Sequence, residues 1–73
     1  MDTAIHVKLH GECWEVTREG GHGVLNRYAS RRDALREAFT KARMDHSELV
    51  LWDEDGAVSE RVPDGKLPAD FVF

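Results

Sequence analysis

Hydrophobic and polar residues alternate along the first part of the chain. In residues 4–10 every second side chain is apolar, and residues 13–17 alternate again around Trp14 and Val16. A period of two is typical of a strand with one buried face. Gly11 lies between the two segments, where a tight turn fits. The pattern therefore predicts an antiparallel hairpin at the start of the chain.

A helical period follows from Arg31 to about Asp45. Its apolar residues recur at i, i+3, i+4 and i+7 and form one stripe: Leu35, Ala38, Phe39 and Ala42, with Ala34 at its edge. This spacing is typical of a helix that buries one face. Ser30 precedes it in the position of an N-cap, and Asp33 follows three residues later, at the positive end of the helix dipole. We predict one amphipathic helix.

Three further strands complete the pattern. Residues 24–29 follow a glycine-rich segment and form a short third strand. Residues 48–52 are apolar on both faces, which favours a central position in a sheet. Residues 53–56 are a strong turn signal that ends in Asp-Gly. Residues 57–62 are mixed in polarity and fit a strand near an edge, which Pro63 ends.

These elements predict an α+β fold: a small antiparallel sheet in the order strand, strand, strand, helix, strand, strand, with the helix packed on one face. We expect a single domain in residues 1–62 and a C-terminal tail in residues 63–73. The predicted core comprises Ile5, Val7, Trp14, Val16, Leu35, Phe39, Leu49 and Leu51. A chain of 73 residues buries only about 60% of the surface that it exposes when unfolded, so its stability is marginal.

Composition narrows the class of protein. Hydrophobic residues make up 41% of the chain, the net charge is -4, and Cys13 is the single cysteine. No apolar run approaches the roughly 18 residues of a membrane span. Residues 1–6 lack the basic and apolar regions of a signal peptide. A lone cysteine cannot form an internal disulfide and fits a reducing compartment. We expect a cytoplasmic protein with no membrane association.

Several segments together resemble a known bacterial family. They are Ile5-His6-Val7, Trp14-Glu15-Val16, the alanine-rich helix, Leu49-Val50-Leu51 and Asp55-Gly56-Ala57-Val58. The chain is similar over about residues 5–60 to the family catalogued as domain of unknown function 2188. Leu9 stands where that family usually has proline, and Trp52 stands where a histidine is common. The resemblance implies a fold and carries no activity.

The sequence offers little for catalysis or metal binding. His6 and His10 fall on one strand face, but four strand residues span about 13 Å, too far for one ion. His46 follows the helix, where a cation is favourable for structural reasons. Cys13 has no orienting partner that the sequence reveals. We expect no enzyme, no cofactor and no metal site.

Charge is unevenly distributed. Residues 30–46 contain five Lys/Arg against three Asp/Glu, whereas residues 47–73 contain two against seven. Arg31, Arg32 and Arg36 lie at the helix start and are candidate phosphate contacts, because helix N-terminal amides also bind anions. The acidic balance of the whole chain argues against nucleic acid as its main partner and favours a solvated helix face.

The C-terminus is the stronger candidate site. It is more apolar than chain ends usually are, and its candidate partner-binding residues are Leu67, Phe71, Val72 and Phe73. These residues either fold back on the sheet or dock on another molecule, by strand addition or as a homodimer contact. The sequence therefore favours a non-catalytic protein-interaction or regulatory module with a protein partner or itself. The alternatives are a nucleic-acid-associated module that uses the helix arginines and a phage or mobile-element inhibitor that uses the acidic hairpin.

Overall fold

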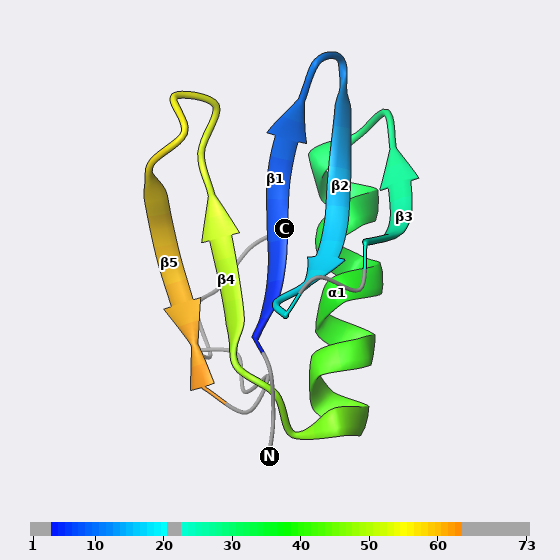
Figure 1. Ribbon diagram of the computed structural model, residues 1–73, viewed down its shortest axis with the longest axis vertical. Helices are drawn as coiled ribbons and strands as arrows, with labels where there is room; N and C mark the ends of the chain where they lie inside the picture. The colour runs from blue at the N-terminus through cyan, green and yellow to red at the C-terminus, as the bar shows by residue number, and fades with distance from the viewer. Residues whose placement is uncertain (1–3, 21–22, 64–73) are drawn as a thin grey trace.

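The structure, a computed structural model, describes residues 4–20 and 23–63. These residues form five strands and one helix, in the order β1 (Ile5–His10), β2 (Cys13–Arg18), β3 (Val24–Tyr28), α1 (Arg31–Asp45), β4 (Leu49–Trp52) and β5 (Val58–Val62). The sheet and the helix form two layers (Figure 1). The α+β class and the sequence of elements agree with the pattern of apolar residues.

The sheet is mixed, which corrects the predicted antiparallel sheet. Its spatial order is β3-β2-β1-β4-β5, and β1 pairs with β4 in parallel. The other three neighbouring pairs are antiparallel. The reason is the crossover: α1 carries the chain back along the sheet after β3, so β4 starts at the same end as β1 (Figure 1). An antiparallel sheet would have needed β4 to start at the other end.

The core lies between α1 and the sheet. Val7 pairs with Val16 across β1 and β2, and both side chains are fully buried. The predicted core residues are all buried, as is the whole alanine-rich stripe of α1. Val62 of β5 joins the same cluster. The helix is therefore held to the sheet by the stripe that its sequence period predicted.

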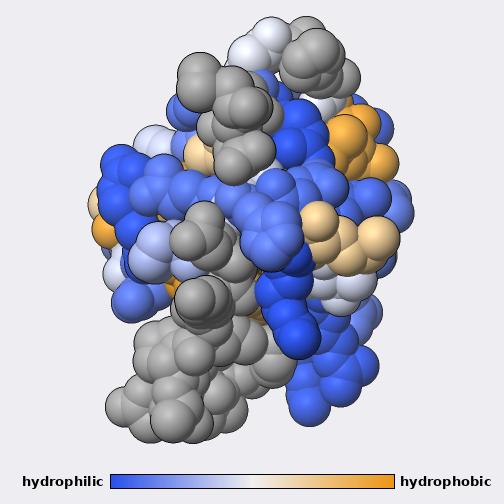
Figure 2. Space-filling model, turned by 90° about the horizontal axis from the view of Figure 1, so that it is seen from below, coloured by the Kyte–Doolittle hydropathy of each residue, from blue (hydrophilic) through white to orange (hydrophobic). Residues whose placement is uncertain are grey.

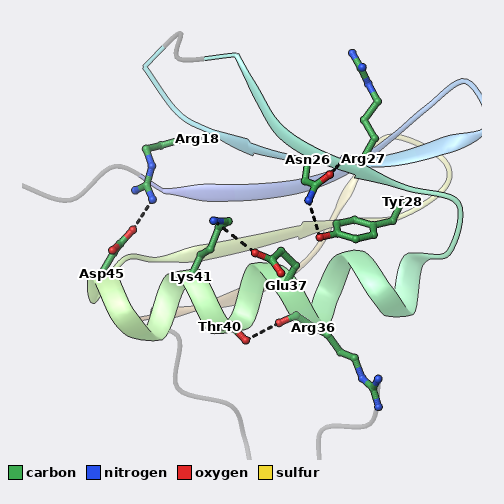
Figure 3. A network of polar contacts seen from close by, with 9 residues as sticks. All are labelled: Arg18, Asn26, Arg27, Tyr28, Arg36, Glu37, Thr40, Lys41 and Asp45. Atoms are coloured by element: carbon green, nitrogen blue, oxygen red, sulfur yellow. Dashed lines mark hydrogen bonds and ion pairs between the residues drawn. The ribbon is translucent and has the colours of Figure 1, made fainter.

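Both ends of α1 have specific caps. The Ser30 hydroxyl accepts a hydrogen bond from the backbone N–H of Asp33 at 3.5 Å, which confirms the predicted N-cap. His46 ends the helix in the left-handed region, with φ 55°, and its backbone N–H donates to the carbonyl of Ala42. Arg18 of β2 forms an ion pair with Asp45 and ties the last turn to the sheet (Figure 3). No helix in the described part of the chain is long and apolar enough to cross a membrane.

The side chain of Asp53 stabilises the turn between β4 and β5. A carboxylate oxygen of Asp53 accepts hydrogen bonds from the backbone N–H groups of Asp55, at 2.9 Å, and Ala57, at 3.0 Å. Gly56 adopts a positive φ of 83°, which side chains disfavour. Asp53 therefore orders the turn that its sequence predicted.

Candidate functional site

The sheet face that α1 leaves uncovered carries a histidine with two bonding partners. The indole Nε1–H of Trp52 donates to Nδ1 of His6 at 3.0 Å. This bond requires a lone pair on Nδ1, so the ring proton is on Nε2, which donates to Glu19 at 3.3 Å. The imidazole is half-buried, and both its nitrogens are engaged. Both ring nitrogens of His6 therefore have partners within the protein.

The same face carries a row of alternating charges across neighbouring strands. The ammonium of Lys8 lies 4.4 Å from the ring centroid of Trp52, within cation–π range. Lys8 pairs in register with Glu15, and Glu15 with Arg27. Glu15 accepts hydrogen bonds from Arg27 at 2.9 Å and from His10 at 3.1 Å.

These partners shift the ionisation of Glu15. The hydrogen bond from Arg27 is the main cause that lowers the pKa of the Glu15 carboxyl, and His10 adds to it, while partial desolvation opposes both. A carboxylate held ionised by two basic partners is a structural anchor for the sheet.

The described residues contain no group of three or more His, Cys, Asp or Glu side chains that could hold a metal ion. Cys13 is a free thiol, and in the strand register it lies opposite His10. His10 directs its Nδ1 toward Glu15. The side chains described on this face therefore form ion pairs and hydrogen bonds with one another.

The structure separates the three arginines predicted as phosphate contacts. The guanidinium of Arg31 lies over the Trp14 ring at 5.4 Å and donates to the Ser59 hydroxyl at 3.5 Å, so this side chain belongs to the packing between α1 and the sheet. Arg32 and Arg36 are exposed on α1. In Figure 3 the side chain of Arg36 points away from the sheet.

The predicted tail site is at Leu67, Phe71, Val72 and Phe73. These residues lie outside the described residues. The proposal that they fold back on the sheet or bind a partner stays a prediction.

The two edge strands carry exposed apolar residues that the sequence did not single out. On β3, Val24 and Leu25 are 38% and 37% exposed, and on β5, Val58 is 39% exposed. In Figure 2 hydrophobic colour shows at the right and left margins of a largely hydrophilic face, the sides on which β3 and β5 lie in Figure 1. Sequence alone could not assign these residues to the surface, because an apolar strand residue is buried or exposed according to the strand's place in the sheet.

The backbone of the edge strand β3 is partly engaged by its own side chains, because the Asn26 side-chain oxygen accepts a hydrogen bond from the backbone N–H of Arg27 at 2.9 Å. Among the described residues β3 pairs with β2 alone, and its register shifts by one residue near Val16 and Thr17. Four of its five residues are exposed, and Tyr28 is half-buried. Asn26 donates to the Tyr28 hydroxyl at 2.9 Å (Figure 3). Burial is the main cause that raises the pKa of the Tyr28 hydroxyl, and the neighbouring Glu37 carboxylate raises it further. A strand edge of this kind is a template for another strand.

Comparison with known proteins gives one match. A family model described as "Uncharacterized protein conserved in bacteria (DUF2188)" matches residues 5–62, which confirms the resemblance seen in the sequence. No curated protein and no solved structure matches the chain. The matched range runs from the first residue of β1 to the last residue of β5.

Proposed function

The chain belongs to the DUF2188 family of uncharacterised bacterial proteins, and we propose that it is a non-catalytic protein-interaction module that binds an extended segment of its partner at the β3 edge. In such strand addition the backbone N–H and C=O groups of the edge provide affinity, and side chains on both faces provide specificity. The cytoplasmic location expected from the sequence is part of this proposal.

The observation that carries the proposal is the exposed apolar start of the β3 edge. Val24 and Leu25 present apolar surface on a strand that pairs, among the described residues, with β2 alone. Natural proteins usually protect such edges with charges, prolines or a covering element. On β3 the one charged side chain, Arg27, is bonded to Glu15 on its own sheet. The edge therefore keeps an apolar segment that a partner strand can cover.

Affinity capture with matched variants tests this function. The wild-type chain, Leu25→Asp and Met44→Gln are compared as baits in extracts, with quantitative mass spectrometry. Met44 is also an exposed apolar residue, 76% exposed against 37% for Leu25, but it lies on α1, away from the edge. We expect proteins enriched on wild type and on Met44→Gln to be lost from Leu25→Asp. Equal capture by all three baits would contradict a role for the β3 edge.

A second candidate function rests on the helix arginines. Arg32 and Arg36 are exposed and stand one helical turn apart on α1, which allows both to contact one phosphate backbone. A nucleic-acid-associated module predicts a mobility shift at low salt that an Arg32→Gln/Arg36→Gln variant loses. Arg31→Gln would instead lower stability, because Arg31 packs on Trp14. A wild-type chain that shifts neither DNA nor RNA at low salt excludes this candidate.

A further inference from the structure

We propose that the occupant of the β3 edge is a second copy of this chain, which adds its own β5 edge head to tail and extends the sheet. This inference rests on the proposed function of the β3 edge and names its partner. It draws on three observations: the directions of the two edge strands, the charges near them, and the apolar residues that both expose.

The directions of the edge strands suit this pairing. β3 runs parallel to β1 through two antiparallel pairs, whereas β5 runs antiparallel to β4 and therefore to β1. A copy displaced sideways by five strand spacings, about 24 Å, and rotated to continue the twist of the sheet brings its β5 antiparallel to β3. The helices of both copies then lie on the same face of a continuous sheet. No strand has to reverse, and no core residue has to move.

The charges of the two sides are complementary. Residues 23–46 include β3 and α1 and contain six Lys/Arg and three Asp/Glu. Residues 47–63 include β4 and β5 and contain one Lys/Arg and five Asp/Glu. The β4–β5 turn, with exposed Glu54 and Asp55, lies at the same end of the sheet as the N-terminus of α1, which carries exposed Arg32 (Figure 1). The acidic β4–β5 turn of the displaced copy then lies at the same end of the extended sheet as the basic start of α1 in the first copy, and their opposite charges attract.

The same charges disfavour pairing between identical edges. Two β3 edges would bring the basic β3 and α1 sides together, and two β5 edges would bring two acidic hairpins together. Like charges across an interface cost several kcal/mol. Both edges nevertheless expose apolar surface, through Val24 and Leu25 on β3 and Val58 on β5. The favoured contact is therefore heterologous, which leaves one free edge at each end of the assembly.

Sedimentation velocity on edge variants tests the proposal. Leu25→Asp places an acid on β3, Glu60→Lys places a base on β5, and Glu12→Lys makes the same charge change at an exposed residue of the β1–β2 turn, away from both edges. Each chain is measured from about 10 µM to about 1 mM at low salt, where charge attraction is least screened. Amide NMR spectra establish that every variant is folded.

Head-to-tail pairing predicts a specific set of masses. The average mass of wild type and of Glu12→Lys rises with concentration and falls as salt is added. Leu25→Asp alone stays monomeric because its β3 edge is blocked, and Glu60→Lys alone stays monomeric because its β5 edge is blocked. An equimolar mixture of the two gains mass, because the intact β5 edge of the first variant pairs with the intact β3 edge of the second. Association should weaken at least tenfold in each single variant.

Three results would overturn the proposal. The first is a wild-type chain that stays monomeric across the concentration range. The second is self-association that survives in Glu60→Lys or in Leu25→Asp, which indicates pairing of identical edges. The third is a mixture of these two variants that gains no mass. If wild type is monomeric but captures other proteins that Leu25→Asp does not capture, self-association is excluded and the proposed function of the β3 edge stands.

Discussion

The bond between Trp52 and His6 links β4 to β1 on the face that has no helix. We predict that Trp52→Phe lowers the free energy of unfolding and releases the His6 ring from its fixed tautomer. The substitution keeps an aromatic ring beneath Lys8 and removes the N–H that donates to Nδ1 of His6 at 3.0 Å. It therefore isolates the hydrogen bond better than a change to alanine would.

The magnitude follows from the surroundings of the bond. A neutral hydrogen bond contributes a net stabilisation of about 1 kcal/mol, and an acceptor left without a donor costs more when it is buried. The His6 side chain is 18% exposed, so water reaches Nδ1 in part. The smaller ring of phenylalanine adds a packing loss. We expect a total of about 1–2 kcal/mol, or roughly 4–16 °C in Tm for a domain of this size.

The assay is a double-mutant cycle by urea denaturation, with Trp52→Phe, His6→Ala and the double variant. The cycle cancels the packing loss and the separate His6–Glu19 contact, and it leaves a coupling energy of about 1 kcal/mol. Nitrogen-15 NMR at a pH where histidines are neutral reports the tautomer directly. In wild type the proton is on Nε2, and in Trp52→Phe the two tautomers mix.

A coupling energy of zero together with an unchanged His6 tautomer in Trp52→Phe would contradict this prediction. In that case Glu19 alone would orient the ring through its bond to Nε2. A Glu19→Gln variant provides the control, because it weakens the Nε2 contact and leaves the Trp52 donor in place.

Four further substitutions have defined outcomes. Arg27→Gln should raise the pKa of Glu15, which an NMR titration measures. In wild type the lowered pKa of Glu15 stabilises the fold at pH values above the unfolded-state pKa, and this stabilisation is lost as the pH falls through the folded-state pKa. The variant should therefore lose less stability than wild type when the solution is acidified. His46→Gly should raise the free energy of unfolding by about 1 kcal/mol in urea, because His46 caps α1 in the left-handed region. Leu35→Ala should lower it by about 2–5 kcal/mol, since Leu35 is buried in the core. Ser47→Ala should not lower it, because the buried Ser47 hydroxyl has no hydrogen-bond partner among the described residues, and a measured loss of stability would show that it has one.

The sequence by itself determined the local elements and the buried faces. The alternation in residues 4–10 and the stripe around Leu35 predicted which side chains enter the core, and all those predicted are buried. Ser30 and Asp53 predicted the helix start and the β4–β5 turn. These features are encoded within a few residues, because side-chain period and capping depend on near neighbours.

The sequence predicted an interior place for residues 48–52 and an edge place for residues 57–62, and both are confirmed, but the neighbours and directions of the strands came only from the tertiary structure. The period of β4 is the same whether it runs parallel or antiparallel to β1, so the direction of the crossover decided their parallel pairing. That pairing brings Trp52 to His6 across 46 positions of the chain. The packing of α1 on the sheet places Arg31, a candidate phosphate contact from the sequence, over the ring of Trp14.

The candidate site at the β3 edge also depends on the order of the strands in the sheet. Nothing in the composition of residues 24–28 distinguishes an edge strand from a central one, and only the order β3-β2-β1-β4-β5 leaves Val24 and Leu25 at the surface. The uneven charge along the chain was visible in the sequence. Its separation in space is a property of the fold, because the basic residues lie on β3 and on the helix that packs against the sheet, whereas the acidic residues lie just before β4, on β5 and in the turn between them.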